Sequence, residues 1–417
     1  MFDTLSSLIQ QPWSLSPNAL LGATLVALVA ALAGEVVWRL WRWPRLLGYG
    51  LVGTALALAG FGIDGRDPMI RLTLDAALAV LLFEAGSRLN LRWLRHNTWL
   101  LGSSVLEALL TAVAVYVVAT QMGVERDVAV TLALILMASA PALALRVVSE
   151  VNASGQVTER LIALSALNTL YAVVALQLAS AGLSLNEPQT WTQALGPVAF
   201  GFFGSIVLAA LVGEGINFVA RRFDLRHDNA VLLMVGCVML ALIVAKTLHL
   251  STLMVPLLTG LWLRNRSERP WVWPRHFGSL GAVLVLGLFV LVNASWAWVD
   301  VRPVLAIAAI VLAVRWLAKT LGVALLAKPS GLSAGQALWL GGALMPVSAS
   351  AWVLGLDFSV RHSGQGQLLM ALLLACIALL ELVSPWIVMA CLRGAGEVDR
   401  TPARDVVWPA ETHESAP

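Results

Sequence analysis

Four charged residues of this sequence lie inside long apolar runs, where a charge is costly. Arg315 and Lys319 are four residues apart in one run, and Glu107 and Glu381 each lie within another. A charged side chain at the centre of a membrane helix costs about 2.5–3.5 kcal/mol on insertion scales, so such residues usually serve a function. A buried carboxylate can bind a cation or a proton, and an ammonium group can release a proton. We therefore take these four residues as candidates for charge coupling.

Two other apolar runs are interrupted by a proline in the middle. The run TLALILMASAPALALRVV contains Ser139 and Pro141, and the run ALWLGGALMPVSASAWVL contains Pro346 and Ser348. Proline removes a backbone donor and clashes with the preceding helical turn, and a bilayer tolerates this where the freed groups face protein or a water-filled cavity. A matched pair of interrupted helices is typical of a transporter's binding site. The alternative is two ordinary proline-kinked helices in a bundle.

The composition excludes an ordinary soluble protein. Of the 417 residues, 59% are hydrophobic and only 12% are charged, and the apolar residues come in long runs. The net charge of +3 says little about nucleic acid, because the basic residues lie in short loops beside the apolar runs, and we expect no nucleic-acid partner. We predict an all-α polytopic protein of the lipid bilayer, with about 13 transmembrane helices. The predicted spans are approximately 18–37, 46–61, 70–87, 99–121, 127–147, 161–183, 195–219, 230–247, 250–263, 277–294, 304–327, 337–357 and 367–390.

Lys and Arg are concentrated in alternate loops of this span pattern. The loops after spans one, three, seven and nine each hold three or four arginines, whereas the loops after even spans hold few basic residues. By the positive-inside rule, the N-terminus is outside and the C-terminus is cytoplasmic. The two proline-interrupted runs are spans five and twelve, which then cross in opposite directions, as the halves of an inverted repeat do.

The chain is expected to contain one folded unit. Residues 1–392 form the transmembrane domain, and the polar, proline-containing segment 393–417 is expected to be a disordered cytoplasmic tail. The three cysteines show no metal-ligand spacing. The spans carry no metal cluster, no nucleophile with an adjacent base and no phosphate loop, so we expect neither a cofactor nor an enzyme.

Several segments, taken in order, resemble one transporter family. They are WRWPRLLGYGLVG (41–53), AVLLFEAGSRLNLRWLRHN (79–97), ALILMASAPALALRVVSEVNASGQVTERLIALSALNTLYAVVAL (133–176), LHLSTLMVPLLTGLWLRNR (248–266) and VRWLAKTLGVALLAK (314–328). On these segments the chain resembles the monovalent cation/proton antiporter superfamily, the sodium/hydrogen exchanger-like transporters, over about residues 20–390.

This resemblance implies a fold and an activity. The family fold is an inverted-repeat bundle with two crossed, unwound helices, here spans five and twelve, and it is usually a homodimer with a scaffold part and a mobile core. The family activity is secondary transport that exchanges sodium or potassium for protons by alternating access. The expected partners are thus a monovalent cation, a proton and a second copy of the chain, and the expected location is a bacterial-type inner membrane.

The sequence departs from the family pattern at the ion-binding acids. At the matching positions, Ala140 stands where an acid is usual, and Thr169 stands where an acid is usual after Asn168. Antiport needs a site whose charge changes when a proton replaces a cation, and the matching residues offer only neutral oxygens. The ion-site residues that the resemblance indicates are Ser139, Pro141, Asn168, Thr169 and Ser348.

The family also places a basic residue on span eleven, facing the acid that is missing here. Lys319 without an acid partner would lose its proton more readily, so we expect it to titrate near neutral pH or to attract anions. The alternative is that Lys319 pairs with another carboxylate or reaches water. Glu107 and Glu381 are the deeper candidates to replace the acid, whereas Glu84 is expected to form a structural pair with Arg88.

Three functions are therefore compatible with the sequence. The leading hypothesis is a sodium or potassium/proton antiporter that works by alternating access. The second is a divergent member with an altered substrate or uncoupled flux, because the acid is replaced. The third is a membrane sensor or scaffold that keeps the fold without transport.

Overall fold

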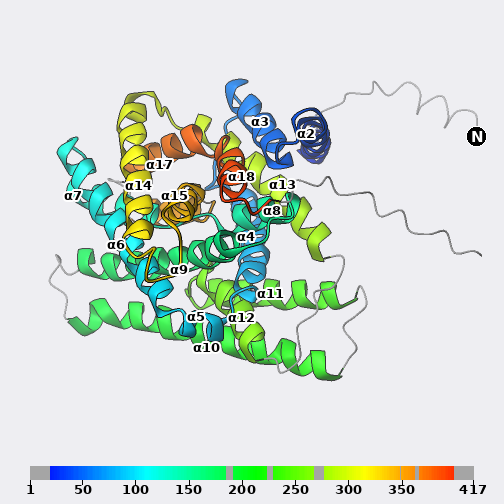
Figure 1. Ribbon diagram of the computed structural model, residues 1–417. Coiled ribbons are helices and arrows are strands. Elements are labelled where there is room, and N and C mark those ends of the chain that lie inside the picture. Colours follow the sequence, from blue (N-terminus) through cyan, green and yellow to red (C-terminus); the bar gives the residue numbers. More distant parts are fainter. Residues whose placement is uncertain are drawn as a thin grey trace, which may run out of the picture.

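The computed structural model describes residues 19–184, 191–222, 229–266, 277–347, 349–361 and 366–398. Within these ranges the regular structure consists of helices (Figure 1). The helices of the first part are α2 (Ala19–Trp41), α3 (Arg45–Leu58), α4 (Pro68–Ser87), α5 (Leu91–His96), α6 (Thr98–Gln121), α7 (Arg126–Leu136), α8 (Pro141–Glu150), α9 (Gln156–Ser184) and α10 (Trp191–Arg222). Those of the second part are α11 (Asn229–Thr247), α12 (Met254–Arg266), α13 (Phe277–Ser295), the 3-10 turns η1 (Trp296–Trp298) and η2 (Arg302–Val304), α14 (Leu305–Leu325), α15 (Ala334–Ala343), α16 (Ala349–Arg361), α17 (Gly366–Leu380) and α18 (Ser384–Gly394).

These helices coincide with the apolar runs of the sequence. Each of the thirteen predicted ranges falls on one helix or on two helices separated by a short break. Six of the described segments, with α7 and α8 counted as one, are long and apolar enough to cross a membrane. The pair α17 and α18, bent by 52°, is a further candidate. Length and apolarity thus favour a protein that crosses the membrane many times.

Both predicted interruptions are present. Helix α7 ends at Leu136 and α8 begins at Pro141, while α15 ends at Ala343 and α16 begins at Ala349, just after Pro346. Proline fits the first turn of a helix because its missing N–H has no partner there in any case. Each break leaves a few residues of non-helical backbone between two short helices.

A third break, which we did not predict from the sequence, separates α17 from α18. The chain turns by 52° there, and Pro385 lies in the first turn of α18. Glu381 lies in the turn itself and is only 2% exposed. The predicted span 367–390 is therefore two helices rather than one.

The helices pack most extensively as two groups. We name α2, α3, α4 and α10–α13 the scaffold group, and α6–α9 with α14–α18 the broken-helix group. Glycines bring backbones together within each group. In the scaffold group, a Cβ built on Gly86 of α4 would lie 2.9 Å from the carbonyl carbon of Leu257 in α12, and one built on Gly260 of α12 would lie 2.8 Å from the Ser87 nitrogen. The close contact fixes α4 against α12.

The described chain continues past the predicted start of the tail. Both carboxylate oxygens of Glu397 accept hydrogen bonds at 2.7 Å, from the backbone nitrogens of Val157 and Thr158 in the first turn of α9. A carboxylate is stabilising at this position because a helix begins with unpaired N–H groups and a positive dipole end. Residues 393–398 therefore belong to the helical body, and the rest of the predicted tail lies outside the described residues.

Candidate functional site

Arg315 joins the two breaks. In the first break, its Nε and Nη2 each donate a hydrogen bond of 2.8 Å, to the carbonyl oxygens of Leu136 and Ala138 respectively. In the second break, its Nη1 donates to the carbonyl oxygen of Met345. The side chain is fully buried. A guanidinium has five donors in a fixed plane, so one side chain can satisfy carbonyls that two broken helices would otherwise leave unpaired.

Two further side chains complete the first break. Lys319 Nζ donates to the carbonyl oxygen of Met137 at 3.1 Å, and Thr169 Oγ1 lies 3.1 Å from the carbonyl oxygen of Ser139. With the two bonds from Arg315, three consecutive carbonyls of this break have a cationic donor, and the Thr169 hydroxyl lies within hydrogen-bond distance of the fourth. Irregular backbone is thus satisfied by protein groups, as the interior of a bilayer demands.

Lys319 also forms an ion pair with Glu107 of α6, between Nζ and Oε1. Helices α6 and α14, cyan and yellow in Figure 1, run side by side although they are far apart in the sequence. Both side chains of the pair are 0% exposed. The prediction that Lys319 lacks an acid partner is therefore wrong, and the alternative of another carboxylate is the one observed. A buried pair is stable only where further hydrogen bonds satisfy its atoms.

Asn168 and Ser139 supply polar contacts around Glu107. Asn168 Nδ2 donates to Glu107 Oε2 at 2.8 Å and lies 3.4 Å from Ser139 Oγ. Ser139 Oγ in turn donates to the carbonyl oxygen of Leu344 in the second break at 3.0 Å. The other amide atom, Asn168 Oδ1, is buried and has no hydrogen-bond partner among the described residues. Carboxylate, amide and hydroxyl oxygens are the ligands that hard cations prefer, so this cluster could hold a monovalent cation.

Three other predicted site residues have different roles or places. Thr169 is buried in α9, but its hydroxyl lies between the carbonyl oxygens of Ser139 and Ser165, at 3.1 and 3.0 Å. It therefore supports the break rather than facing Glu107. Pro141 begins α8. Ser348 lies outside the described residues.

Glu381, the second acid considered as a replacement, is not part of this cluster. It lies in the turn between α17 and α18, and within the described part of the chain its Oε2 has no hydrogen-bond partner. Of the two deep acids, the structure brings Glu107 to the breaks. Sequence reasoning identified both acids but could not distinguish them, because both have the same local signature of one carboxylate in an apolar run.

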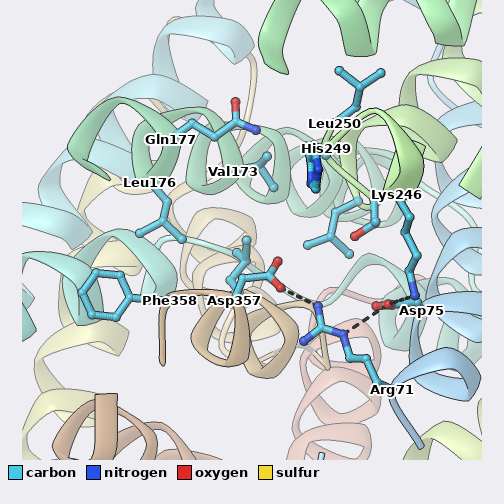
Figure 2. A pocket seen from close by; sticks show the side chains of 14 residues that line it. Arg71, Asp75, Val173, Leu176, Gln177, Lys246, His249, Leu250, Asp357 and Phe358 are labelled. Atoms are coloured by element: carbon cyan, nitrogen blue, oxygen red, sulfur yellow. Dashed lines mark hydrogen bonds and ion pairs between the residues drawn. The ribbon is translucent and has the colours of Figure 1, made fainter. Parts of the chain in front are cut away.

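Two pockets lie beside α9, on either side of Asn168 along the helix. The distal pocket, of about 280 Å³, lies away from the basic segment 88–95 and is shown in Figure 2. Among the residues that line it are Val173, Leu176 and Gln177 of α9, Arg71, Asp75, Lys246 and Asp357. The proximal pocket, of about 460 Å³, lies beside the basic segment, and its lining includes Ser87, Arg88, Glu159, Ile162 and Ala163. Thus α9 contributes to both pockets and to the polar cluster between them.

Two interrupted helices around a buried ion pair, with a pocket on each side, define the architecture of a membrane transporter. The family model for the transmembrane part of sodium/hydrogen exchangers matches residues 24–393. The chain therefore belongs to the sodium/hydrogen exchanger family, and it is a multi-pass membrane transporter of that family. Membership of this family agrees with the expectation that the chain is not an enzyme.

Solved structures show the same fold. The structure of the sodium proton antiporter MjNhaP1 from Methanocaldococcus jannaschii at pH 8 is 18% identical with a TM-score of 0.64, covering 90% of this chain and 98% of that one. A structure of MjNhaP1 from an electron-microscopy map is 17% identical with a TM-score of 0.73, covering 92% and 99%. A comparison with curated protein sequences finds no match.

Proposed function

We propose that this chain exchanges a monovalent cation, sodium or potassium, for protons, and that Glu107 takes the place of the acid missing at Thr169. The observation that carries the proposal is the buried Lys319–Glu107 pair between the two breaks. Two positive charges 4 Å apart repel by about 4 kcal/mol at an effective dielectric constant of 20. When an ammonium group and a metal cation share one carboxylate in so confined a site, this repulsion favours the loss of one of the two positive charges.

Exchange follows from this charge balance. A cation that binds Glu107, with Asn168 Oδ1 and Ser139 Oγ as neutral ligands, places a second positive charge beside the Lys319 ammonium. Loss of the Lys319 proton relieves the repulsion, and return of a proton expels the cation. Arg315 keeps its charge throughout, because its guanidinium is held by carbonyls of both breaks. Lys319 would thus carry the proton and Glu107 the cation.

The two pockets give this mechanism its two openings. Alternating access would expose the Glu107 site first to the distal pocket and then to the proximal pocket, by movement of the broken-helix group against the scaffold group. We propose thirteen spans, an external N-terminus, a cytoplasmic C-terminus and a bacterial-type inner membrane. In this arrangement α7–α8 and α15–α16 cross as the halves of an inverted repeat, and two copies form a homodimer. The alternation of basic loops and the two breaks support this arrangement.

Transport by reconstituted vesicles tests the proposal. Vesicles with an acidic interior and a quenched pH dye should show dequenching on addition of sodium or potassium. Glu107→Gln should abolish the dye response, because the cation loses its carboxylate. Lys319→Ala should also abolish it, because cation movement is then no longer coupled to protons. Glu214→Gln is the control, because Glu214 is 45% exposed on the surface of the bundle. An unchanged response in Glu107→Gln would show that this carboxylate does not carry the cation.

A second candidate, transport without proton coupling or no transport, is favoured by one observation. Arg315 and Lys319 donate to the carbonyls of the first break, so those oxygens are already occupied by protein cations. Thr169→Asp restores the usual acid beside Asn168 and separates the two candidates. Exchange in Thr169→Asp but not in the natural chain would identify a protein that has lost antiport.

A further inference from the structure

Helix α4 carries a charged residue near each end, and each is paired with one half of a broken helix. Arg71 Nη2 lies 2.6 Å from Asp357 Oδ1 of α16, and Glu84 Oε2 lies 2.6 Å from Arg146 Nη2 of α8. Helix α4 also packs directly against α8 and α16. The two pairs therefore join the scaffold group to the broken-helix group at two places.

The first pair lies at the distal pocket (Figure 2). Arg71 Nε lies 3.2 Å from Asp75 Oδ2 on the same helix, and Lys246 Nζ of α11 lies 2.7 Å from the same oxygen. Asp75 is 2% exposed, so it holds both cations on the scaffold side. Asp357 reaches Arg71 from the other group, and the contact ties the two walls of the pocket together.

The second pair lies next to the proximal pocket. Glu84 accepts a bond from Arg88 at 3.3 Å, as its spacing predicted, and Arg88 lines that pocket. The partner from the other group, Arg146, fits because α13 has glycine at position 281. A Cβ built on Gly281 would lie 2.7 Å from Arg146 Cζ and closer still to Nη2. The pair therefore depends on an empty space that the scaffold provides.

These pairs differ from the other contacts of α4. Helix α4 contacts α12 backbone against backbone at Gly86 and Gly260. The two helices cannot slide past each other there without a steric clash. Ion pairs of long side chains can break and form again. We propose that Arg71–Asp357 and Glu84–Arg146 are two latches between the groups, the first closing the distal pocket and the second the proximal pocket. This inference rests on the alternating-access function proposed above, because a cycle that opens one pocket at a time must release the latch on that side.

Cysteine labelling measures the opening of each pocket directly. The background is a variant in which Cys237, Cys376 and Cys391 are replaced by alanine. Leu176→Cys reports on the distal pocket and Ala163→Cys on the proximal pocket, because these residues line them. The measurement is the rate of reaction with a charged methanethiosulfonate reagent in detergent solution, where both pockets can be reached and no ion gradient exists.

The distal latch is broken by Asp357→Asn. The control is Asp64→Asn, which removes an exposed ion pair with Arg66 inside a single loop. Asp357→Asn should raise the labelling rate of Leu176→Cys about two- to fivefold, the range expected for a partly exposed ion pair. Asp64→Asn should leave that rate unchanged.

The proximal latch is broken without any change of charge by Gly281→Ala, which displaces the Arg146 guanidinium. The control is Gly287→Ala on the same helix, where a Cβ would meet nothing within 4 Å. Gly281→Ala should raise the labelling rate of Ala163→Cys about fivefold or more, because this pair is more buried than the first. Gly287→Ala should not change it.

The proposal requires each variant to open its own pocket. Labelling rates equal to those of the control variants overturn the proposal. An equal rise in the labelling rates of Leu176→Cys and Ala163→Cys also overturns it, because it indicates that the whole bundle has become less tightly packed. Vesicle transport by Glu107→Gln separates this inference from the proposed function. If Glu107→Gln transports normally while the latch variants raise the labelling rates as expected, the proposed role of Glu107 is wrong and the latch proposal still holds.

Discussion

Gly322 of α14 lies directly against the backbone of Glu107 in α6. A Cβ built on Gly322 would lie 2.8 Å from Glu107 Cβ and closer still to its Cα. The absence of a side chain lets the two helices approach closely. Lys319 lies three residues earlier on α14, on about the same face, so the close approach brings its ammonium to the Glu107 carboxylate. A glycine thus positions the ion pair of the candidate site.

Gly322→Ala is expected to separate α6 from α14 and weaken this ion pair. Inserting a methyl group into a closely packed contact costs about 1–3 kcal/mol, against a gain of up to about 1 kcal/mol in helix propensity. Thermal unfolding in detergent and vesicle transport should both decline. Gly335→Ala is the control, because a Cβ there meets nothing within 4 Å. Normal stability and transport in Gly322→Ala would show that the close contact is unnecessary.

Removing one partner of the Lys319–Glu107 pair is expected to lower the stability of the protein more than removing both partners does. Glu107→Leu leaves a buried ammonium group unpaired, and Lys319→Met leaves a buried carboxylate unpaired, each at a cost of about 3–5 kcal/mol. The double variant should recover most of this stability, because apolar replacement of a buried pair is often close to neutral. Unfolding midpoints of the four proteins measure the coupling. If the stability loss of the double variant equals the sum of the two single losses, Lys319 and Glu107 do not interact directly.

The helices could be predicted from the sequence because the bilayer leaves few alternatives. Long apolar runs must satisfy their own backbone, so each becomes a helix, and Pro141 and Pro346 mark two breaks because proline cannot continue one. The break between α17 and α18 was not predicted, although Glu381 and Pro385 both lie in the range 367–390, because we interpret this apolar run as one continuous helix. Pro385 lies in the first turn of α18, a position that looks like the interior of a single span in the sequence.

The candidate site could be predicted only in part. Asn168 Nδ2 lies 3.4 Å from Ser139 Oγ, and Glu107 connects Asn168 with Lys319; that these residues bind the ion stays a prediction. Glu107 was recognisable as a buried acid, but no local spacing connects its helix with that of Lys319, because the pair is a tertiary contact between distant segments. Glu381 has the same sequence signature and lies elsewhere, in a turn. The sequence shows that a buried charged residue needs a partner of opposite charge. Only the packing of the helices determines which residue that partner is.

Arg315→Lys is expected to destabilise both breaks although it keeps the charge. A single ammonium group cannot reach the carbonyls that the planar guanidinium joins, and each carbonyl left unpaired costs about 1–3 kcal/mol. Amide hydrogen exchange should become faster at residues 136–140, 344, 345 and 347, and the unfolding temperature should fall. The control is Arg302→Lys, because the Arg302 side chain is 85% exposed in a surface pair with Asp300. Unchanged exchange at both breaks would show that Arg315 does not hold them together.

Thr169→Val distinguishes support of the break from ion binding. The Thr169 hydroxyl lies 3.1 Å from the carbonyl oxygen of Ser139, so its loss should cost about 1–3 kcal/mol in stability and leave the KM for sodium or potassium unchanged. Thr259→Val in α12 is a matched control, because Thr259 is buried and bonds the Val255 carbonyl oxygen of its own helix at 2.8 Å. Stability by thermal unfolding and KM by vesicle transport are measured for both variants. A raised KM in Thr169→Val alone would place this hydroxyl among the cation's ligands and return the ion site to the position where the family usually has its acid.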